Sequence, residues 1–527
     1  MTTDIKRDIL KNTAVVAVMT IISRITGVVR ELAKAIFLGT GIGADAFTIA
    51  YMIPNLLRRL VAEGAMSAAF IPVLSEYLHK DKRKELYDFL SNFFGFICFV
   101  VTLITIVGIA AAPFYVKHLF AYGFRSVPGK VELTVVLTQI MFVYIVLISI
   151  SAFFQALLNA HHLFSVPAST PIFLNLTIIA FAYFFSRYFS EPSYAFSIGV
   201  VLGGILQVVI QIPWVMKLGL LKRPRISWKH QGVKKATRLL IPSLFGISVY
   251  QIDIALSEII ATTLPEGSVS SLQYSMRLVE LTLGVVVISI ATVILPIFSR
   301  QASSGQFEEL KDTLRFSLRL IAFIGFPATV GLLVLSREIV ASVYMYGQFD
   351  TRSLELTAFA LQFHGIGLFF IGASRMLIQP FYSLQDTKTP VIISFFVMIT
   401  NVTLCFILSH FLANGGIALG SSLSCALQCI LLLFALRKKI GLLGLRSLII
   451  PFAKIMLASL GMGAICMIPH LTLALEDFSS ILQRLLYMSG ILVSAGVSYV
   501  IFSYLTKSHE LQEIVTMIKS KFIRPSL

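Results

Sequence analysis

The sequence predicts an all-α polytopic membrane protein with fourteen transmembrane helices. Composition is the first observation: of 527 residues, 57% are hydrophobic and 13% charged, with a mean hydropathy of +0.87, whereas about a quarter of the residues in a globular protein are charged. The second is that apolar runs long enough to cross a bilayer as a helix recur from residue 12 to residue 506. These runs lack the alternation of a transmembrane β-barrel.

The apolar runs set the order of the expected helices, and the longest of them must tilt, kink or extend beyond the hydrocarbon. The expected spans are 12–37, 44–77, 88–112, 131–158, 165–187, 194–216, 236–263, 269–299, 312–335, 354–382, 388–411, 415–436, 447–469 and 483–505.

The distribution of basic residues gives an independent test of this topology. With a cytoplasmic N-terminus, the inside segments hold 27 of the 43 Lys and Arg residues. The outside segments hold only six, namely Lys117, Arg125, Lys130, Arg187, Arg337 and Arg352. By the positive-inside rule, this asymmetry supports an even number of spans with both termini in the cytoplasm. The net charge of +17 is therefore mainly an orientation signal, and because it is scattered over separate loops we expect no nucleic-acid partner.

Short internal echoes indicate a repeat. RLVAE followed by FIPVLS in the second span returns as RLVE followed by ILPIFS in the eighth, about 220 residues later. A shift of six helices preserves topology, so the two copies should relate by an axis along the membrane normal. The predicted organisation is an N-terminal lobe of helices 1–6 (1–216), a basic cytoplasmic linker (217–238), a C-terminal lobe of helices 7–12 (239–440), and two further helices with a cytoplasmic tail (441–527).

Motifs for catalysis or metal binding are weak. GTGIGAD at 39–45 resembles a phosphate-binding loop, but no strand precedes it, so a tight turn between helices is the better interpretation. Cys425 and Cys429 share a helix face without a His or acid at ligand spacing, which favours packing over a metal site. We expect no enzyme, no catalytic residues, no metal and no cofactor. The first apolar run has no small-residue cleavage site after it, so we expect it to remain as a helix.

Charged residues inside predicted spans are the main functional signal, because each costs about 2.5–3.5 kcal/mol at the middle of a bilayer. Pairing within a helix is one explanation, since Arg59 and Glu63, Arg277 and Glu280, and Arg24 and Glu31 each share a helix face. A water-filled cavity for an anionic substrate is the other, and an excess of cations favours it. In helices one, two and eight the cations are Arg24, Arg30, Lys34, Arg58, Arg59 and Arg277, and the acids are Glu31, Asp45, Glu63 and Glu280.

Arginine suits phosphate, because its planar and permanently charged fork binds phosphate oxygens in pairs. The residues alone thus predict a secondary transporter of an anionic substrate, driven by an ion gradient or the membrane potential.

Five stretches carry a resemblance along nearly the whole chain. They are ISRITGVVRE (22–31), ADAFTIAYMIPNLLRRLVAEGAMSAAFIPVLSEY (44–77), YSMRLVE (274–280), YGQF (346–349) and FYSLQDTKTPV (381–391). They resemble the MurJ (MviN) family of lipid II flippases, part of the multidrug, oligosaccharidyl-lipid and polysaccharide exporter superfamily. The resemblance implies translocation of undecaprenyl-diphosphate-linked disaccharide pentapeptide from the inner to the outer leaflet of the bacterial cytoplasmic membrane, for peptidoglycan synthesis.

The same resemblance implies roles for individual residues. Substrate-binding arginines of the family match Arg24, Arg30, Arg58 and Arg277. Gating or charge-pairing positions match Glu31, Asp45, Arg59, Glu63 and Glu280. Some relatives have lysine in place of Met52 and aspartate in place of Glu31, so gating contacts there differ. The last two helices are expected to form a groove for the lipid tail.

One acidic residue is a candidate for energy coupling, and the resemblance implies a set of partners. Asp253 in the seventh helix is a candidate site for a coupling Na⁺ or proton, and a structural hydrogen bond is the alternative. Expected partners are lipid II, membrane lipids and the cell-wall synthesis machinery, with the chain itself a monomer.

Two other functions compete with a flippase. An exporter of polysaccharide-linked lipids or drugs from the same superfamily is one, although exporters of cationic drugs favour acidic cavities. A membrane-embedded enzyme acting on the polyprenyl carrier is the other, although no outside loop exceeds about 20 residues, too few for a catalytic domain. A structural scaffold would leave the buried charges without a role.

Overall fold

A computed structural model describes residues 3–59, 70–79, 83–220, 223–227, 230–472, 481–513 and 516. These residues form helices and no strands. The α-helices are α1 (Thr3–Leu38), α2 (Ile42–Arg58), α3 (Ile71–His79), α4 (Arg83–Tyr115), α5 (Lys130–Phe142), α6 (Tyr144–Ala160), α7 (Ser165–Phe185), α8 (Ser193–Lys217), α9 (Gln231–Ala261), α10 (Ser268–Ser303), α11 (Phe307–Val334), α12 (Ser336–Tyr344), α13 (Thr351–Ile366), α14 (Leu368–Ser383), α15 (Lys388–Ile440), α16 (Ile449–Thr472) and α17 (Ile481–Leu505). Short π or 3₁₀ turns are η2 (Val116–Phe120), η3 (Tyr122–Ser126), η4 (Ser186–Tyr188) and η5 (Leu445–Leu448).

The chain folds into two compact units. The first comprises residues 1–270 together with the segment Tyr346–Phe349, and the second comprises Ser271–Met345 and Asp350–Leu527. The helix α10 therefore begins in the first unit and continues in the second. The segment Tyr346–Phe349 returns to the first unit from within the second.

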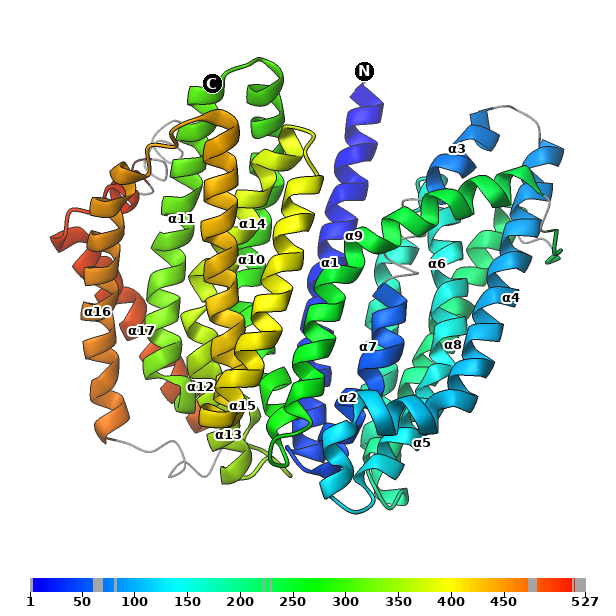
Figure 1. The fold of residues 1–527 in the computed structure, drawn as a ribbon, viewed down its shortest axis with the longest axis horizontal. Helices are drawn as coiled ribbons and strands as arrows, with labels where there is room; N and C mark the ends of the chain where they lie inside the picture. Colours follow the sequence, from blue (N-terminus) through cyan, green and yellow to red (C-terminus); the bar gives the residue numbers. More distant parts are fainter. Residues whose placement is uncertain are drawn as a thin grey trace. The chain divides into compact units, whose positions relative to one another are not determined.

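In the first unit, α4, α6 and α8 run alongside one another, and α7 packs on both α8 and α1 (Figure 1). Small residues allow the closest contact, between α7 and α8. A Cβ atom on Gly203 would lie 2.7 Å from Cδ1 of Leu174 and 3.2 Å from its Cα. Glycines four residues apart on α8 (Gly199 and Gly203) thus let two apolar helices approach closely, which is how helices gain packing energy in lipid.

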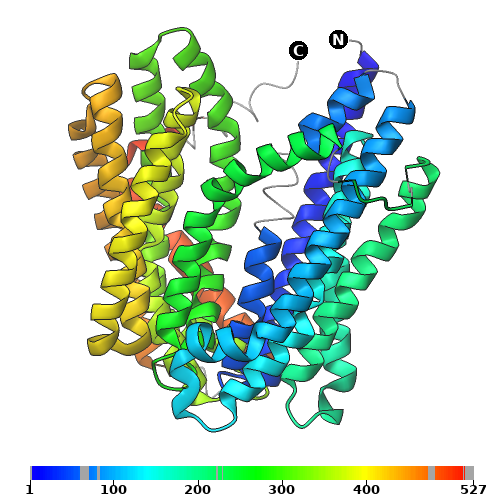
Figure 2. The same ribbon diagram turned by 45° about the vertical axis from the view of Figure 1, so that its right-hand side comes forward.

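In the second unit, α11 packs on α16, and α16 packs on α17 (Figure 2). The shared core is apolar and includes Ala322, Ile455 and Cys466, each fully buried. One hydrogen bond crosses this core, from the hydroxyl of Tyr499 in α17 to the carbonyl oxygen of Phe323 in α11 at 2.7 Å. The last two helices are thereby fixed against α11.

The helix α15 is a hairpin. Ala413 has φ +46° and ψ −127°, which interrupts the helix. Sγ of Cys405 lies 3.5 Å from the carbonyl oxygen of Ile417, whereas twelve residues of straight helix would separate them by about 18 Å. In Figure 1 the two arms are the yellow and orange rods above the α15 label. The break falls between the predicted spans 388–411 and 415–436.

Eight helices of the described residues are long and apolar enough to cross a membrane, and α13 with α14, bent by 43°, would form a ninth span. The all-helical membrane class is therefore confirmed. The count of fourteen spans, the two six-helix lobes, their repeat symmetry and the domain limits at residues 216, 238 and 440 stay predictions. Part of the repeat, the stretch RLVAE at 59–63, extends beyond the described residues.

Candidate functional site

The carboxylate of Asp45 in α2 accepts hydrogen bonds from three residues. Its side chain is 1% exposed. Oδ2 accepts from the backbone nitrogen of Gly267 at 2.8 Å, and Oδ1 accepts from the backbone nitrogen and hydroxyl of Ser270 at 2.9 and 2.8 Å. Because these donors form the N-terminus of α10, Asp45 caps that helix from another helix and complements its dipole.

Lys130 completes the Asp45 site. Its Nζ lies 2.8 Å from Oδ2 of Asp45, its side chain is 2% exposed, and the ammonium stands 4.1 Å from the centre of the Phe124 ring. Lys130 was predicted to lie in an outside segment, and its pairing with Asp45 was not predicted. A signal was present, since Lys130 directly precedes an apolar run, but the sequence does not indicate which acid it meets.

A second polar group joins α1 to α7. NH2 of Arg30 lies 2.6 Å from Oε1 of Glu31, and NH1 donates to Oδ1 of Asn175 at 3.1 Å. Nδ2 of Asn175 donates back to α1, to the carbonyl oxygen of Ser23 and the hydroxyl of Thr26, both at 3.3 Å. Asn175 therefore orients the Arg30 guanidinium, and sequence reasoning did not single it out.

Lys34 lies one turn beyond Arg30 on α1. It is 3% exposed, and its Nζ donates to the hydroxyl of Thr48 in α2 at 2.8 Å. Glu258 in α9 lies within electrostatic reach of both Lys34 and Arg59. Its Oε2 is buried and has no hydrogen-bond partner within the described part of the chain. The first unit thus gathers charges from α1, α2 and α9.

The arginines at the end of α2 bind neutral partners. Nε of Arg58 donates to Oδ1 of Asn55 at 3.0 Å, and NH1 of Arg59 donates to Oε1 of Gln251 in α9 at 3.1 Å. These bonds orient the two guanidinium groups. Asp253 is half-buried on α9, two residues from Gln251.

The four remaining predicted residues are Arg24, Glu63, Arg277 and Glu280. Arg24 is exposed on α1. Arg277 and Glu280 form an ion pair of 2.8 Å within α10, in the second unit, with side chains 36% and 41% exposed. Glu63 lies outside the described residues. The structure thus brings Arg30, Glu31, Asp45, Arg58, Arg59 and Asp253 into one unit, and the approach of Arg277 to this group stays a prediction.

The YGQF motif inserts into the first unit. The backbone nitrogen of Gln348 donates to the carbonyl oxygen of Ile36 at 2.8 Å. Gly39 and Gly347 have φ of +56° and +62°, and a Cβ atom on either would come within 2.3 Å of a backbone oxygen of the other segment. Glycine is therefore required at both positions to hold this segment against the end of α1.

The QDTKTP motif closes α15. Asp386 accepts from the backbone nitrogens of Lys388 and Thr389 at 3.1 and 3.0 Å, and from the Thr389 hydroxyl at 2.6 Å. It also pairs with Lys439 at the far end of the α15 hairpin. The hydrogen bonds from Lys439 and Thr389 hold the pKa of Asp386 well below its usual range. Asp386 thus joins both ends of the hairpin.

In chemical terms, the described residues of the first unit offer several cationic donors. The arginine and lysine side chains come from α1, α2 and α5, and the acids near them accept hydrogen bonds or face cations. Within the described ranges, no three His, Cys, Asp or Glu side chains form a group that could hold a metal ion. The arrangement suits binding of an anion more than bond-breaking chemistry.

Comparison with known proteins gives a consistent answer. The family model described as "Lipid II flippase MurJ" matches residues 34–487. The chain is 36% identical over 435 residues to a probable lipid II flippase MurJ of Vibrio cholerae, an alignment that covers 81% of this chain and 83% of the relative.

Solved structures agree. A lipid II flippase MurJ in an inward closed conformation superposes with a TM-score of 0.76 at 26% identity, covering 97% of this chain and 99% of the other. An inward-facing multidrug resistance transporter of the MATE family superposes with a TM-score of 0.65 at 14% identity, covering 82% of this chain and 98% of the other. The second similarity extends to the fold alone.

Proposed function

We propose a mechanism from one premise: the chain belongs to the MurJ family of lipid II flippases. It is a transporter and not an enzyme. The match of the family model to residues 34–487 is the observation that carries this conclusion. The substrate is lipid II, the undecaprenyl-diphosphate-linked disaccharide pentapeptide, which moves from the inner to the outer leaflet for peptidoglycan synthesis.

The substrate diphosphate is bound by arginines. We assign this role to Arg24, Arg30, Arg58 and Arg277. Two of these assignments, Arg30 and Arg58, are supported by the hydrogen bonds that their guanidinium groups donate to the amide oxygens of Asn175 and Asn55, because these bonds orient both groups. Bidentate charge-assisted bonds to a diphosphate are stronger than these amide bonds. Arriving substrate would therefore rearrange the site.

Alternating access supplies the movement. Two lobes rock about the bound head group, while the polyprenyl tail remains in lipid and in a groove formed by α16 and α17. Asp45 acts as a gating residue, because its carboxylate fixes the first turn of α10 to α2 and α5. Glu31, Glu63 and Glu280 act in the same cycle by pairing with the arginines and lysines of the site, and Arg59 acts by pairing with its acids.

Coupling to an ion is assigned to α9. Asp253 binds Na⁺ or a proton, or the membrane potential acts directly on the charged substrate. The protein lies in the bacterial cytoplasmic membrane as a monomer with both termini inside, next to the cell-wall synthesis machinery.

A depletion experiment tests the function. In cells depleted of the protein, lipid II exposed on the outer leaflet should fall while total lipid II rises, and re-expression of the chain should restore both. Normal outer-leaflet exposure after depletion would contradict the proposal. If a different polyprenyl-linked saccharide accumulated inside, the polysaccharide-lipid exporter would be the correct function.

A further inference from the structure

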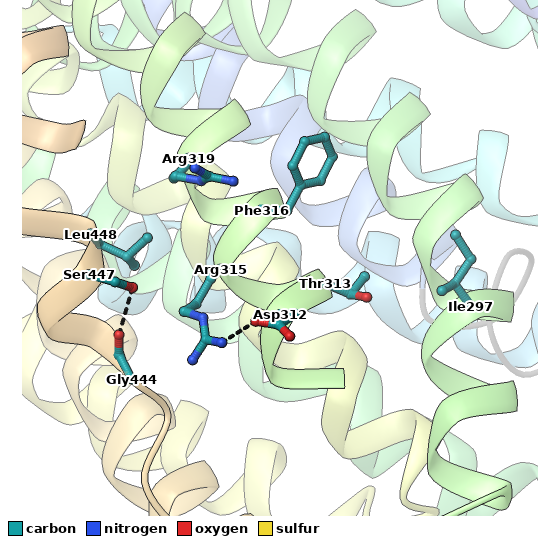
Figure 3. A pocket seen from close by; sticks show the side chains of 9 residues that line it. All are labelled: Ile297, Asp312, Thr313, Arg315, Phe316, Arg319, Gly444, Ser447 and Leu448. Carbon is teal, nitrogen blue, oxygen red and sulfur yellow. Dashed lines mark hydrogen bonds and ion pairs between the residues drawn. The ribbon is translucent and has the colours of Figure 1, made fainter. Parts of the chain in front are cut away.

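A cavity lies in the second unit. Its volume is about 850 Å³. Ile297 near the end of α10, the first turns of α11 and the η5 turn line it (Figure 3). The lining residues of α11 are Asp312, Thr313, Arg315, Phe316 and Arg319, and those of η5 and its approach are Gly444, Ser447 and Leu448.

Two arginines, Arg315 and Arg319, line the cavity, and they differ in how firmly other residues hold them. Arg315 donates to the carbonyl oxygen of Leu443 at 3.0 Å and pairs with Asp312. It also passes so close to Gly444 that a Cβ atom there would lie 2.1 Å from NH1. Arg315 is thus a fixed part of the wall.

Arg319 is held loosely. Its ion-pair partners are Glu510 and Glu513 of the C-terminal tail, and both N···O distances are 3.9 Å, beyond hydrogen-bonding range. The carboxylate of Glu510 is itself buried, and its Oε1 has no hydrogen-bond partner among the residues described. In Figure 3 the Arg319 guanidinium stands beside the cavity. The tail acids therefore sit near Arg319 without satisfying its donors.

Exposed apolar side chains lie next to the η5 turn that lines the cavity. Leu442, Ile449 and Ile450, next to η5 on either side, are 72%, 65% and 67% exposed. Arg446 lies in η5 between them and is exposed. Apolar side chains facing lipid beside a basic, partly polar cavity are typical of a binding site for an anionic lipid head group.

From this geometry we infer a binding site for the phosphodiester head group of an anionic membrane lipid. Arg319 is the principal residue that binds the head group, and the carboxylates of Glu510 and Glu513 compete with the lipid for Arg319. Phosphate oxygens at hydrogen-bond distance would bind Arg319 more strongly than carboxylates at 3.9 Å. Lipid binding would then release the tail. The site is separate from the arginines assigned to lipid II, so it stands whether or not the flippase mechanism is correct.

Native mass spectrometry of the full chain in detergent tests the site. Titration with phosphatidylglycerol should give one tightly bound lipid, and Arg319→Ala should weaken its binding about tenfold, the loss expected for a charge-assisted hydrogen bond. Arg437→Ala is the matched control, because Arg437 is an exposed arginine outside the cavity lining. Equal affinities in the two variants would overturn the inference.

Two further measurements identify the ligand and control for misfolding of the variants. Glycerol 3-phosphate should not compete, nor should zwitterionic phosphatidylcholine, whereas competition by glycerol 3-phosphate at similar concentration would mean a site for a free phosphate ester. Glu510→Gln should tighten phosphatidylglycerol binding up to about fivefold. A misfolded variant cannot bind more tightly, so unchanged or weaker binding in Glu510→Gln would refute the competitor role of the tail.

Discussion

The ammonium of Lys130 in α5 lies 2.8 Å from the carboxylate of Asp45 in α2, and both side chains are at most 2% exposed. Asp45 at the same time binds the first turn of α10 through three hydrogen bonds. One buried carboxylate therefore connects three helices of the first unit. The pair is a testable stability element, because a buried charge left without its partner is costly.

Replacing Lys130 by Met should destabilise the protein by about 3–5 kcal/mol, since it leaves Asp45 buried without its cation. Asp45→Asn should destabilise the protein more than Lys130→Met does, because the amide of Asn turns a donor toward the backbone nitrogens of α10. Thermal unfolding midpoints in detergent measure both. Arg125→Met serves as control, since Arg125 is an exposed basic residue close by in η3. An unchanged midpoint in Lys130→Met would contradict the prediction.

Lowering the pH should weaken the interactions of Asp386 with Lys439 and Thr389. The pKa of Asp386 is lower in the folded protein than in the unfolded chain, because Lys439 and Thr389 donate hydrogen bonds to it. Its contribution is therefore fully present above the unfolded pKa of about 3.9 and is lost as the pH falls through the folded value. The stability deficit of Asp386→Asn, measured as a difference in melting temperature, should be constant from about pH 8 to 5 and shrink below about pH 4. A deficit that grows in acid would oppose this.

Variants of Arg277 can distinguish a role in substrate binding from a role in ion pairing with Glu280. If it binds diphosphate, Arg277→Ala should abolish complementation of a depleted strain while membrane abundance stays near normal, because its side chain is 36% exposed and contributes little to packing. Arg277→Lys should restore little activity, since lysine lacks the bidentate fork. Glu280→Ala and the double variant complete the set. Rescue of Arg277→Ala by removal of Glu280 would assign both residues to structural pairing.

Replacing Gly347 should destabilise the protein for two reasons, a backbone cost and a steric clash, and two variants can separate them. Gly347→Ala combines a positive φ of +62° with a clash against the Ile36 carbonyl oxygen. Gly305→Ala has a similar φ of +70° but open space around it, so it carries the backbone cost alone, about 1–2 kcal/mol. Melting temperatures should fall further for Gly347→Ala than for Gly305→Ala, and equal shifts would mean that the YGQF contact with α1 adds nothing.

Cysteine labelling tests the topology. In a cysteine-free background, Lys84→Cys and Lys438→Cys should react only from the cytoplasm, and Arg125→Cys and Phe411→Cys only from outside. These positions are exposed in the structure. Opposite accessibility at Lys438 and Phe411 would support a membrane-crossing arm of the α15 hairpin, and equal accessibility would contradict the fourteen-span topology.

Apolar patterning predicted much of the helical architecture. The break between 388–411 and 415–436 was expected where the sequence reads ANGG, and the structure turns at Ala413. Hydropathy reports such breaks because polar and glycine residues interrupt a run that lipid requires to be apolar. The predicted span 131–158 corresponds to one continuous candidate span, Lys130–Ala160. Hydropathy did not reveal the 43° bend between α13 and α14 inside the predicted span 354–382, because this bend interrupts a helix without changing its hydropathy.

Partner choice was harder to predict than helix position. Helical spacing suggested Arg24 as the partner of Glu31, but Arg30 binds it, although adjacent residues do not face each other on a helix. Asn175 on α7 draws the Arg30 guanidinium into place. Lys130 was missed for the same reason, since its acid lies 85 residues earlier in the chain. Such pairs are decided by packing between helices, which a single sequence does not encode locally.

The shared helix α10 has a mechanical consequence. Ser270 is anchored to Asp45 in the first unit, while the helix continues from Ser271 to Ser303 in the second. These 33 residues form a rod about 50 Å long. A pivot of about 10° at Ser270 would sweep its far end through roughly 9 Å if the rod stayed straight. The carboxylate of Asp45 would then hold the pivot of a long lever, so small adjustments at Asp45 would produce large displacements at the far end of α10.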